Sequence, residues 1–149
     1  MKNLKIYLAH PINGLTPDEV FDYYTKAEES FLAMGYTVFH PMTGKEHLRC
    51  EERFRAVGYD HPVTSNHAIH QRDLWMVKQA DVVYCNLMNV SKVSIGCVSE
   101  LTAGYIWRKH NVVAMESGSV HEHAFVLEAL SVRWYSEVEA EQYLHDFNK

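Results

Sequence analysis

The sequence has few cysteines, no long apolar run and no excess of positive charge. Its three cysteines are odd in number and widely spaced, which favours reduced thiols over a disulfide framework. No apolar stretch is typical of a membrane span or a signal peptide, so we expect a cytoplasmic protein with no membrane partner. The formal net charge of −5 argues against a nucleic-acid polymer as partner, because that affinity depends on lysine and arginine.

Sequence patterns for common cofactors are also missing. The chain lacks both the dinucleotide fingerprint and the phosphate loop that ends in Gly-Lys-Ser or Gly-Lys-Thr, which argues against NAD and ATP. Histidines are frequent, including His61, His67 and His70, and His121 and His123, but none has the spacing typical of a metal site. We therefore predict no metal and no cofactor, and interpret these histidines as surface or lid residues, with His121 or His123 near a cleft.

Short apolar segments alternate regularly with helical patterns along the sequence. The chain of 149 residues fits one domain, residues 1–149. Strands are expected at 4–9, 36–39, 81–87, 111–115 and 132–135, with helices at 16–34, 65–79, 97–109, 124–130 and 136–147. This alternation predicts an α/β fold with a doubly wound, five-stranded parallel sheet, flavodoxin-like or Rossmann-like, and helices on both faces.

One segment, residues 42–64, interrupts the alternation. It is charged, contains Gly44, Gly58 and Pro62, and shows only fragments of helical spacing. Long irregular segments in compact domains are often functional lids, and we predict a lid here. A surface insertion without a function is an equal alternative.

The loops at the carboxyl ends of the strands are the expected place for a ligand. Parallel sheets bind ligands there, at the point where the strand order changes direction. Candidate substrate-binding residues in these loops are His10, Ile12, Asn13, Asn86, Ser94, Gly96 and Ser117.

Residues 91–104 follow the third strand and open a helix. The unpaired N–H groups of a helix start can bind an anion, so Ser94 and Gly96 could hold a phosphate with Glu100 just beyond them. The alternative is structural, because carboxylates are favoured in the first helical turn by the helix dipole alone.

A second carboxylate, Asp73, falls on the apolar stripe of the preceding helix, together with Met76 and Val77. A buried aspartate must be paired, hydrogen-bonded or turned into a cleft. Asp73 and Glu100 could therefore flank a glycosidic bond and divide the roles of nucleophile and acid–base catalyst. Equally, Asp73 could lie at the edge of the stripe and pair locally.

Several motifs, in the correct order along the chain, resemble the nucleoside 2-deoxyribosyltransferase superfamily, which includes the nucleoside 5′-monophosphate N-glycosidases. They are residues 6–12, 35–41, 72–73 with 80–83, and 94–96 with 100–101. The resemblance implies that Glu100 is the nucleophile, that Asp73 assists the base or the acceptor, and that Tyr7 orients the nucleophile. Transferases acting on free nucleosides commonly have Asp where this chain has Ser94, whereas the monophosphate hydrolases have Ser.

These observations predict an enzyme that cleaves the N-glycosidic bond of a (deoxy)nucleoside 5′-monophosphate through a glycosyl-Glu100 intermediate. The alternative within the family is exchange of bases on free deoxynucleosides, and the alternative of another class is a non-catalytic nucleotide-binding module. The expected partners are a small nucleotide or nucleoside and further copies of the chain. The resemblance implies a homodimer or larger assembly with shared sites, and leaves the base unassigned.

Overall fold

A computed structural model describes residues Met1–Lys149. Its five strands form one parallel sheet in the order β2-β1-β3-β4-β5. The strands are β1 (Lys5–Ala9), β2 (Thr37–Phe39), β3 (Val82–Asn86), β4 (His110–Ala114) and β5 (Val132–Trp134). The predicted five-stranded parallel sheet is confirmed, with the flavodoxin-like strand order.

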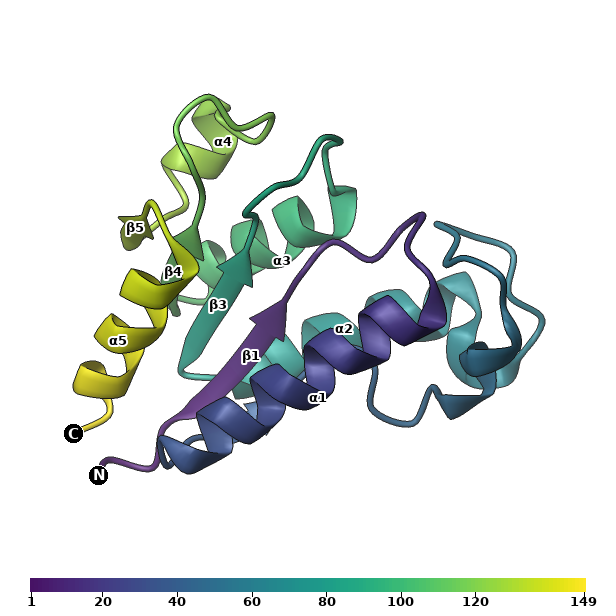
Figure 1. The fold of residues 1–149 in the computed structure, drawn as a ribbon, viewed down its shortest axis with the longest axis horizontal. Coiled ribbons are helices and arrows are strands. Elements are labelled where there is room, and N and C mark those ends of the chain that lie inside the picture. Colours follow the sequence, from purple (N-terminus) through teal and green to yellow (C-terminus); the bar gives the residue numbers. More distant parts are fainter.

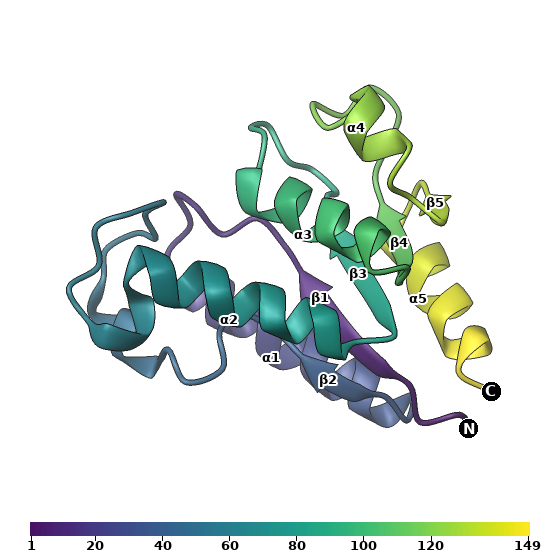
Figure 2. The ribbon, with the colours of Figure 1, turned by 180° about the vertical axis from the view of Figure 1, so that it is seen from behind.

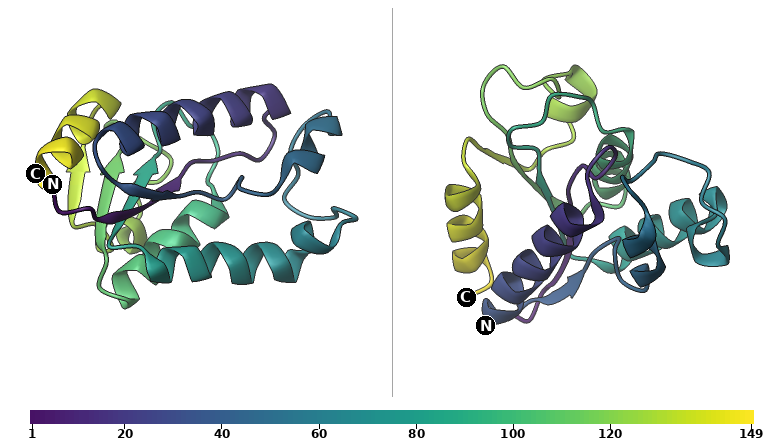
Figure 3. Two further views of the ribbon diagram at one scale, coloured as in Figure 1. Left: turned by 90° about the horizontal axis from the view of Figure 1, so that it is seen from below. Right: turned by 45° about the vertical axis from the view of Figure 1, so that its right-hand side comes forward.

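The helices cover both faces of the sheet, as predicted. They are α1 (Pro17–Ala33), α2 (Asn66–Gln79), α3 (Ile95–Ile106), α4 (Ala124–Leu127) and α5 (Glu137–Phe147). Helices α1 and α5 lie on one face, in front in Figure 1, and α2 and α3 lie on the other, in front in Figure 2. The left view of Figure 3 shows the resulting three layers from below. None of these helices has the length and apolar character needed to cross a membrane.

Capping residues place the helix starts. Thr16 and Glu19 form the capping box that the sequence predicts, with Thr16 N–H donating to Glu19 Oε2 at 2.8 Å and Glu19 N–H to Thr16 Oγ1 at 3.3 Å. Helix α3 begins two residues before the expected position because the Ser94 hydroxyl accepts the Cys97 N–H at 3.2 Å. Ser94 is therefore part of the helix start rather than of the loop before it.

The two-residue period of the strands divides the core in two. Ile6 and Leu8 of β1 pack toward α1 and α5, whereas Tyr7 and Ala9 pack toward α2 and α3. All four side chains are buried, as expected of a strand between two helical layers. This alternation turns Tyr7 toward the helices that carry both candidate catalytic carboxylates.

The irregular segment 42–64 contains two short 3-10 helices, Glu46–Cys50 and Pro62–Thr64. It is anchored to the loop after β1, where Gly14 N–H donates to the Phe54 carbonyl and Phe54 N–H to the Leu15 carbonyl, each at 2.8 Å. Met42, Lys45, Leu48, Phe54 and Thr64 are all buried. These five side chains anchor the segment to the domain, while most of its other residues are exposed.

Candidate active site

A group of buried polar side chains lies between β1, α2 and α3, on the α2–α3 face of the sheet. The strand order changes direction between β1 and β3, so the chain leaves these neighbouring strands in opposite directions. The group consists of Tyr7 on β1, Asp73 on α2, Glu100 on α3 and Lys45 from the irregular segment. The first three were predicted from the sequence, and the structure brings them together.

Glu100 is the most deeply buried carboxylate of the site, with 9% of the residue exposed. Burial raises its pKa well above the ordinary glutamate value, and the neighbouring Cys97 and Asp73 raise it further. Tyr7 and Lys45 act in the opposite direction. A carboxylate with a raised pKa in a buried cluster is typical of a group held ready for chemistry.

Tyr7 is completely buried beside Glu100. The Tyr7 hydroxyl and the Glu100 Oε2 atom both lack a hydrogen bond of good geometry within the protein. Buried polar atoms without partners are costly and uncommon in folded proteins. The Tyr7 hydroxyl lies close enough to Glu100 to lower the pKa of that carboxyl group, so the two side chains form one polar unit within the buried site.

Asp73 faces two cations. Its Oδ1 atom lies 3.8 Å from Lys45 Nζ and 3.9 Å from Arg72 Nε, and it has no hydrogen bond. Burial raises the pKa of Asp73, while Lys45 and Arg72 lower it. Only 16% of the Asp73 side chain is exposed, so it lies on an inward face of α2, and it also makes the local pairing that the sequence left open, with the adjacent Arg72.

The predicted anion cradle at the start of α3 is partly occupied by the protein itself. The Ser94 N–H donates to Nε2 of the buried His121 at 2.9 Å, so this N–H is not free for a ligand. The Ser94 hydroxyl proton stays available, because the oxygen acts only as acceptor in the cap. A methyl group placed at Gly96 would lie 3.8 Å from Glu100 Oε1, an ordinary van der Waals contact, so Gly96 lies directly beside the Glu100 carboxylate.

The remaining sequence candidates divide into two groups. His10 and Asn86 are held internally, with the His10 Nδ1 atom 2.9 Å from the Asn86 carbonyl and the Asn86 side chain accepting the Met88 N–H at 3.0 Å. Ile12 is half-buried, whereas Asn13 and Ser117 are exposed in turns. The structure thus places Asn13 and Ser117 at the surface of the carboxyl-end loops and gives them no contact with the carboxylates.

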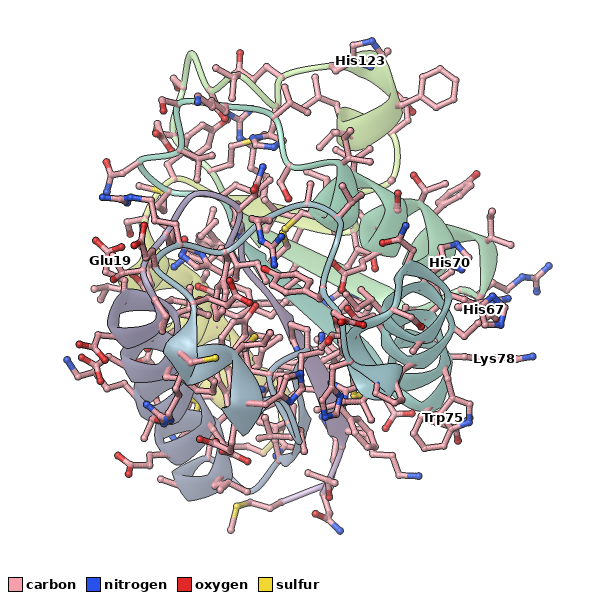
Figure 4. The ribbon with its side chains drawn as sticks, turned by 90° about the vertical axis from the view of Figure 1, so that its right-hand side faces the viewer. Glu19, His67, His70, Trp75, Lys78 and His123 are labelled. Atoms are coloured by element: carbon pink, nitrogen blue, oxygen red, sulfur yellow. The ribbon has the colours of Figure 1, made fainter.

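Most of the histidines lie apart from one another, and the exception is His61, whose ring stacks on that of His47 with the centroids 3.7 Å apart. His67 and His70 point outward from α2, and His123 lies at the start of α4 (Figure 4). No group of three or more histidine, cysteine or acidic side chains is arranged to hold a metal ion. His121 is the one of these histidines that the structure builds into the site, through its contact with Ser94.

Lys45 is the site residue that sequence reasoning missed. It lies in the segment without periodicity, where a lysine ordinarily indicates solvent exposure. In the structure only 2% of Lys45 is exposed. No pattern in the sequence signals this burial, because it depends on how segment 42–64 packs against α2.

No family model and no curated protein matches the chain. Among solved structures, a 2-deoxyribosyltransferase from the psychrotolerant bacterium Bacillus psychrosaccharolyticus is similar with a TM-score of 0.64 and 22% identity, over 93% of this chain and 91% of that one. A 2-deoxyribosyltransferase from Leishmania mexicana has a TM-score of 0.64 and 15% identity, over 98% and 99% of the two chains. The CMP N-glycosidase of Clostridium botulinum has a TM-score of 0.55 and 13% identity, over 96% and 98%.

These similarities cover nearly the whole length of each chain and agree with the resemblance seen in the sequence motifs. The chain therefore has the fold that the 2-deoxyribosyltransferases share with the CMP N-glycosidase.

Proposed function

We propose that this chain is an enzyme that cleaves the N-glycosidic bond of a (deoxy)nucleoside 5′-monophosphate, giving free base and sugar phosphate. The observation that carries the proposal is the convergence of three buried polar atoms without hydrogen bonds. They are the Tyr7 hydroxyl, Asp73 Oδ1 and Glu100 Oε2. The proposal includes a single catalytic domain, with segment 42–64 as a lid beside the site and no cofactor.

In the first step the ionised Glu100 attacks C1′ of the sugar and forms a glycosyl ester. The bond between C1′ and the base nitrogen breaks, its electron pair goes to the base, and the base takes a proton from Asp73. Tyr7 holds the attacking carboxylate in place through its hydroxyl. Burial raises the pKa of both carboxyl groups, so the pair tends to retain a proton, and the reactive form of the proposal is the one in which Asp73 carries that proton.

In the second step water replaces the base. Asp73, now ionised, takes a proton from the water, the water oxygen bonds to C1′, and Glu100 leaves with its electron pair. A second base in place of water would complete a transfer reaction instead. This alternative is supported by the two transferases among the similar structures.

The experiment that tests the proposal compares substrates and acceptors. The protein is incubated with nucleosides and with nucleoside 5′-monophosphates, with and without an added base, and free and exchanged bases are separated by chromatography. Release only from monophosphates supports hydrolysis, and exchange on nucleosides supports transfer. Absence of both products contradicts catalysis and leaves the non-catalytic nucleotide-binding module.

In this proposal, the preference of the enzyme for a nucleoside 5′-monophosphate over a free nucleoside depends on Ser94. We expect Ser94→Asp to lower kcat/KM for the monophosphate at least tenfold, about 1.4 kcal/mol, because a carboxylate repels the phosphate. Aspartate is also a good N-cap, so helix α3 keeps its start. The measurement is kcat/KM on a nucleoside and on its 5′-monophosphate.

The matched control is Ser91→Asp, which adds the same charge to the exposed loop three residues earlier. It is expected to leave both substrates unaffected. An equal loss on both substrates in Ser94→Asp would assign Ser94 to the fold of the site rather than to the phosphate.

We also propose that the chain associates with copies of itself through α3 and α4. Ile95, Tyr105, Ile106 and Phe125 are exposed by 80%, 63%, 66% and 74%, and a groove of about 410 Å³ runs between the two helices. Large exposed apolar patches are typical of interfaces. Such an interface lies beside the helix that carries Glu100, consistent with sites shared between copies.

Phe125→Asp is therefore expected to weaken association about tenfold or more, measured by sedimentation at several concentrations, because it would bury a charge in an apolar interface. Val138→Asp is the control, since Val138 is 78% exposed on α5, away from this patch. A wild-type chain that stays monomeric at all concentrations would contradict the proposal.

A further inference from the structure

Lys45 is a buried cation with unused hydrogen-bonding capacity. Its residue is 2% exposed, its ammonium group makes no hydrogen bond within the protein, and its nearest charged partner is Asp73 at 3.8 Å. A lysine is rarely buried to this extent unless it is paired. Burial lowers the pKa of Lys45, while Asp73 and Glu100 raise it.

Charged and titratable groups surround Lys45 from every neighbouring element. They are Arg72 and Asp73 on α2, Glu100 on α3, His40 after β2 and His47 in the first 3-10 helix. Arg72 is held by its Nη2, which donates to the Pro41 carbonyl at 2.6 Å, while its Nε lies 3.9 Å from Asp73 Oδ1 and its charge lowers the pKa of Asp73. His40 pairs with Glu28 at 3.5 Å. Lys45 is thus the buried cation that acts on both carboxylates.

We propose that Lys45 is a positioning residue that keeps the Glu100–Asp73 pair in its singly protonated, reactive form. The inference rests on the proposed function, in which Glu100 attacks as a carboxylate and Asp73 donates a proton. With one proton on the pair, the negative charge of Glu100 and the positive charge of Lys45 balance. Lys45 lowers the pKa of both carboxyl groups, against the larger effect of burial.

Removal of the Lys45 charge is expected to raise the pH at which the Glu100 and Asp73 carboxyl groups lose their protons. Two coupled carboxyl groups titrate as a unit and give a bell-shaped dependence of rate on pH. In Lys45→Met, which keeps most of the buried stem, we expect both limbs of the profile of kcat/KM to move up by about one pH unit. Lys45→Arg keeps the charge, and we expect its profile to return toward that of the wild type.

A second measurement does not depend on activity. Carboxyl groups labelled with ¹³C are titrated by NMR in the wild type and in Lys45→Met, and the pair is expected to titrate about one unit higher in the variant. Lys78→Met is the control, since it removes a lysine charge from the outer face of α2 (Figure 4) and is expected to move neither measurement.

Two results would overturn the inference. One is a Lys45→Met variant in which kcat/KM falls at every pH while the pH profile keeps its position, together with an unchanged carboxyl titration. The other is a rise in KM for monophosphates alone, which would make Lys45 a phosphate ligand. If the wild type releases no base from any substrate, the proposed function fails, whereas the NMR titration still decides the role of Lys45.

Discussion

Glu100→Gln is expected to lower kcat for base release by about 10³-fold or more, because the amide oxygen cannot form the glycosyl ester. The exchange is nearly isosteric, so the packing of Glu100 against Tyr7 is expected to persist. The measurement is release of free base from the preferred substrate under single-turnover conditions. A glycosyl adduct detected by mass spectrometry on Glu100 of the wild type, and absent from the variant, would identify the intermediate directly.

Two further variants make this result specific. Glu100→Asp keeps the charge but withdraws the carboxylate, and displacement of a reacting group by about 1 Å can cost on the order of 10² in rate. Glu29→Gln makes the same change on the exposed surface of α1 and is expected to have no effect. If Glu100→Gln retained full activity, the covalent mechanism would be wrong.

Glu100→Gln is expected to stabilise the folded protein even though it removes activity. Burial raises the pKa of Glu100 in the folded state above its value in the unfolded chain. Between these two pKa values the folded state holds more protons, so its stability falls as pH rises through that window. Glu100→Gln is therefore expected to have a higher Tm than the wild type at neutral and alkaline pH, and the difference is expected to shrink below the ordinary glutamate pKa.

Asp73→Asn is the second substitution expected to cause a large loss in kcat. An amide cannot protonate the departing base or take a proton from water, and such acid–base catalysis contributes about 10²–10⁴ in rate. We expect a loss of this order in kcat, larger for bases that leave poorly. The measurement compares kcat on substrates whose bases differ in acidity, because an acidic base needs less help from Asp73.

The control for this comparison is Asp22→Asn, which changes an exposed aspartate on α1. A loss in Asp73→Asn that is equal for all bases would contradict proton donation to the leaving group. It would instead assign Asp73 to the structural pairing with Lys45 and Arg72.

The sequence predicted most of the fold because its signals are local. Thr16 and Glu19 mark the start of α1 through hydrogen bonds within four residues, and the backbone φ of +83° at Gly35 suits the end of that helix. The alternation of buried strands and helices in turn limits the sheet to a parallel arrangement. Helix α3 begins two residues earlier than the sequence pattern predicts, because Ser94 caps the helix and does not belong only to the loop before it.

The candidate carboxylates could also be found from the sequence. Asp73 stands out in the sequence as a charge on an apolar helical stripe, and Glu100 as a carboxylate near the expected ligand edge. The expected place of Glu100 in the first helical turn is wrong, because α3 begins at Ile95 and Glu100 lies in its second turn. The sequence suggests that the two carboxylates share a site but cannot give their separation, because the distance between two helices depends on packing rather than on local pattern. The contact of the Ser94 N–H with His121 spans 27 residues and had no sequence signal.

The sequence by itself therefore determined the elements, the parallel sheet and the side of it where chemistry is expected, because hydrophobic period and capping act over a few residues. Only the tertiary structure decided that Lys45 is buried at 3.8 Å from Asp73. The physical reason is that burial of a lysine depends on the packing of segment 42–64 over α2. Charge balance in the site is thus a property of the folded chain.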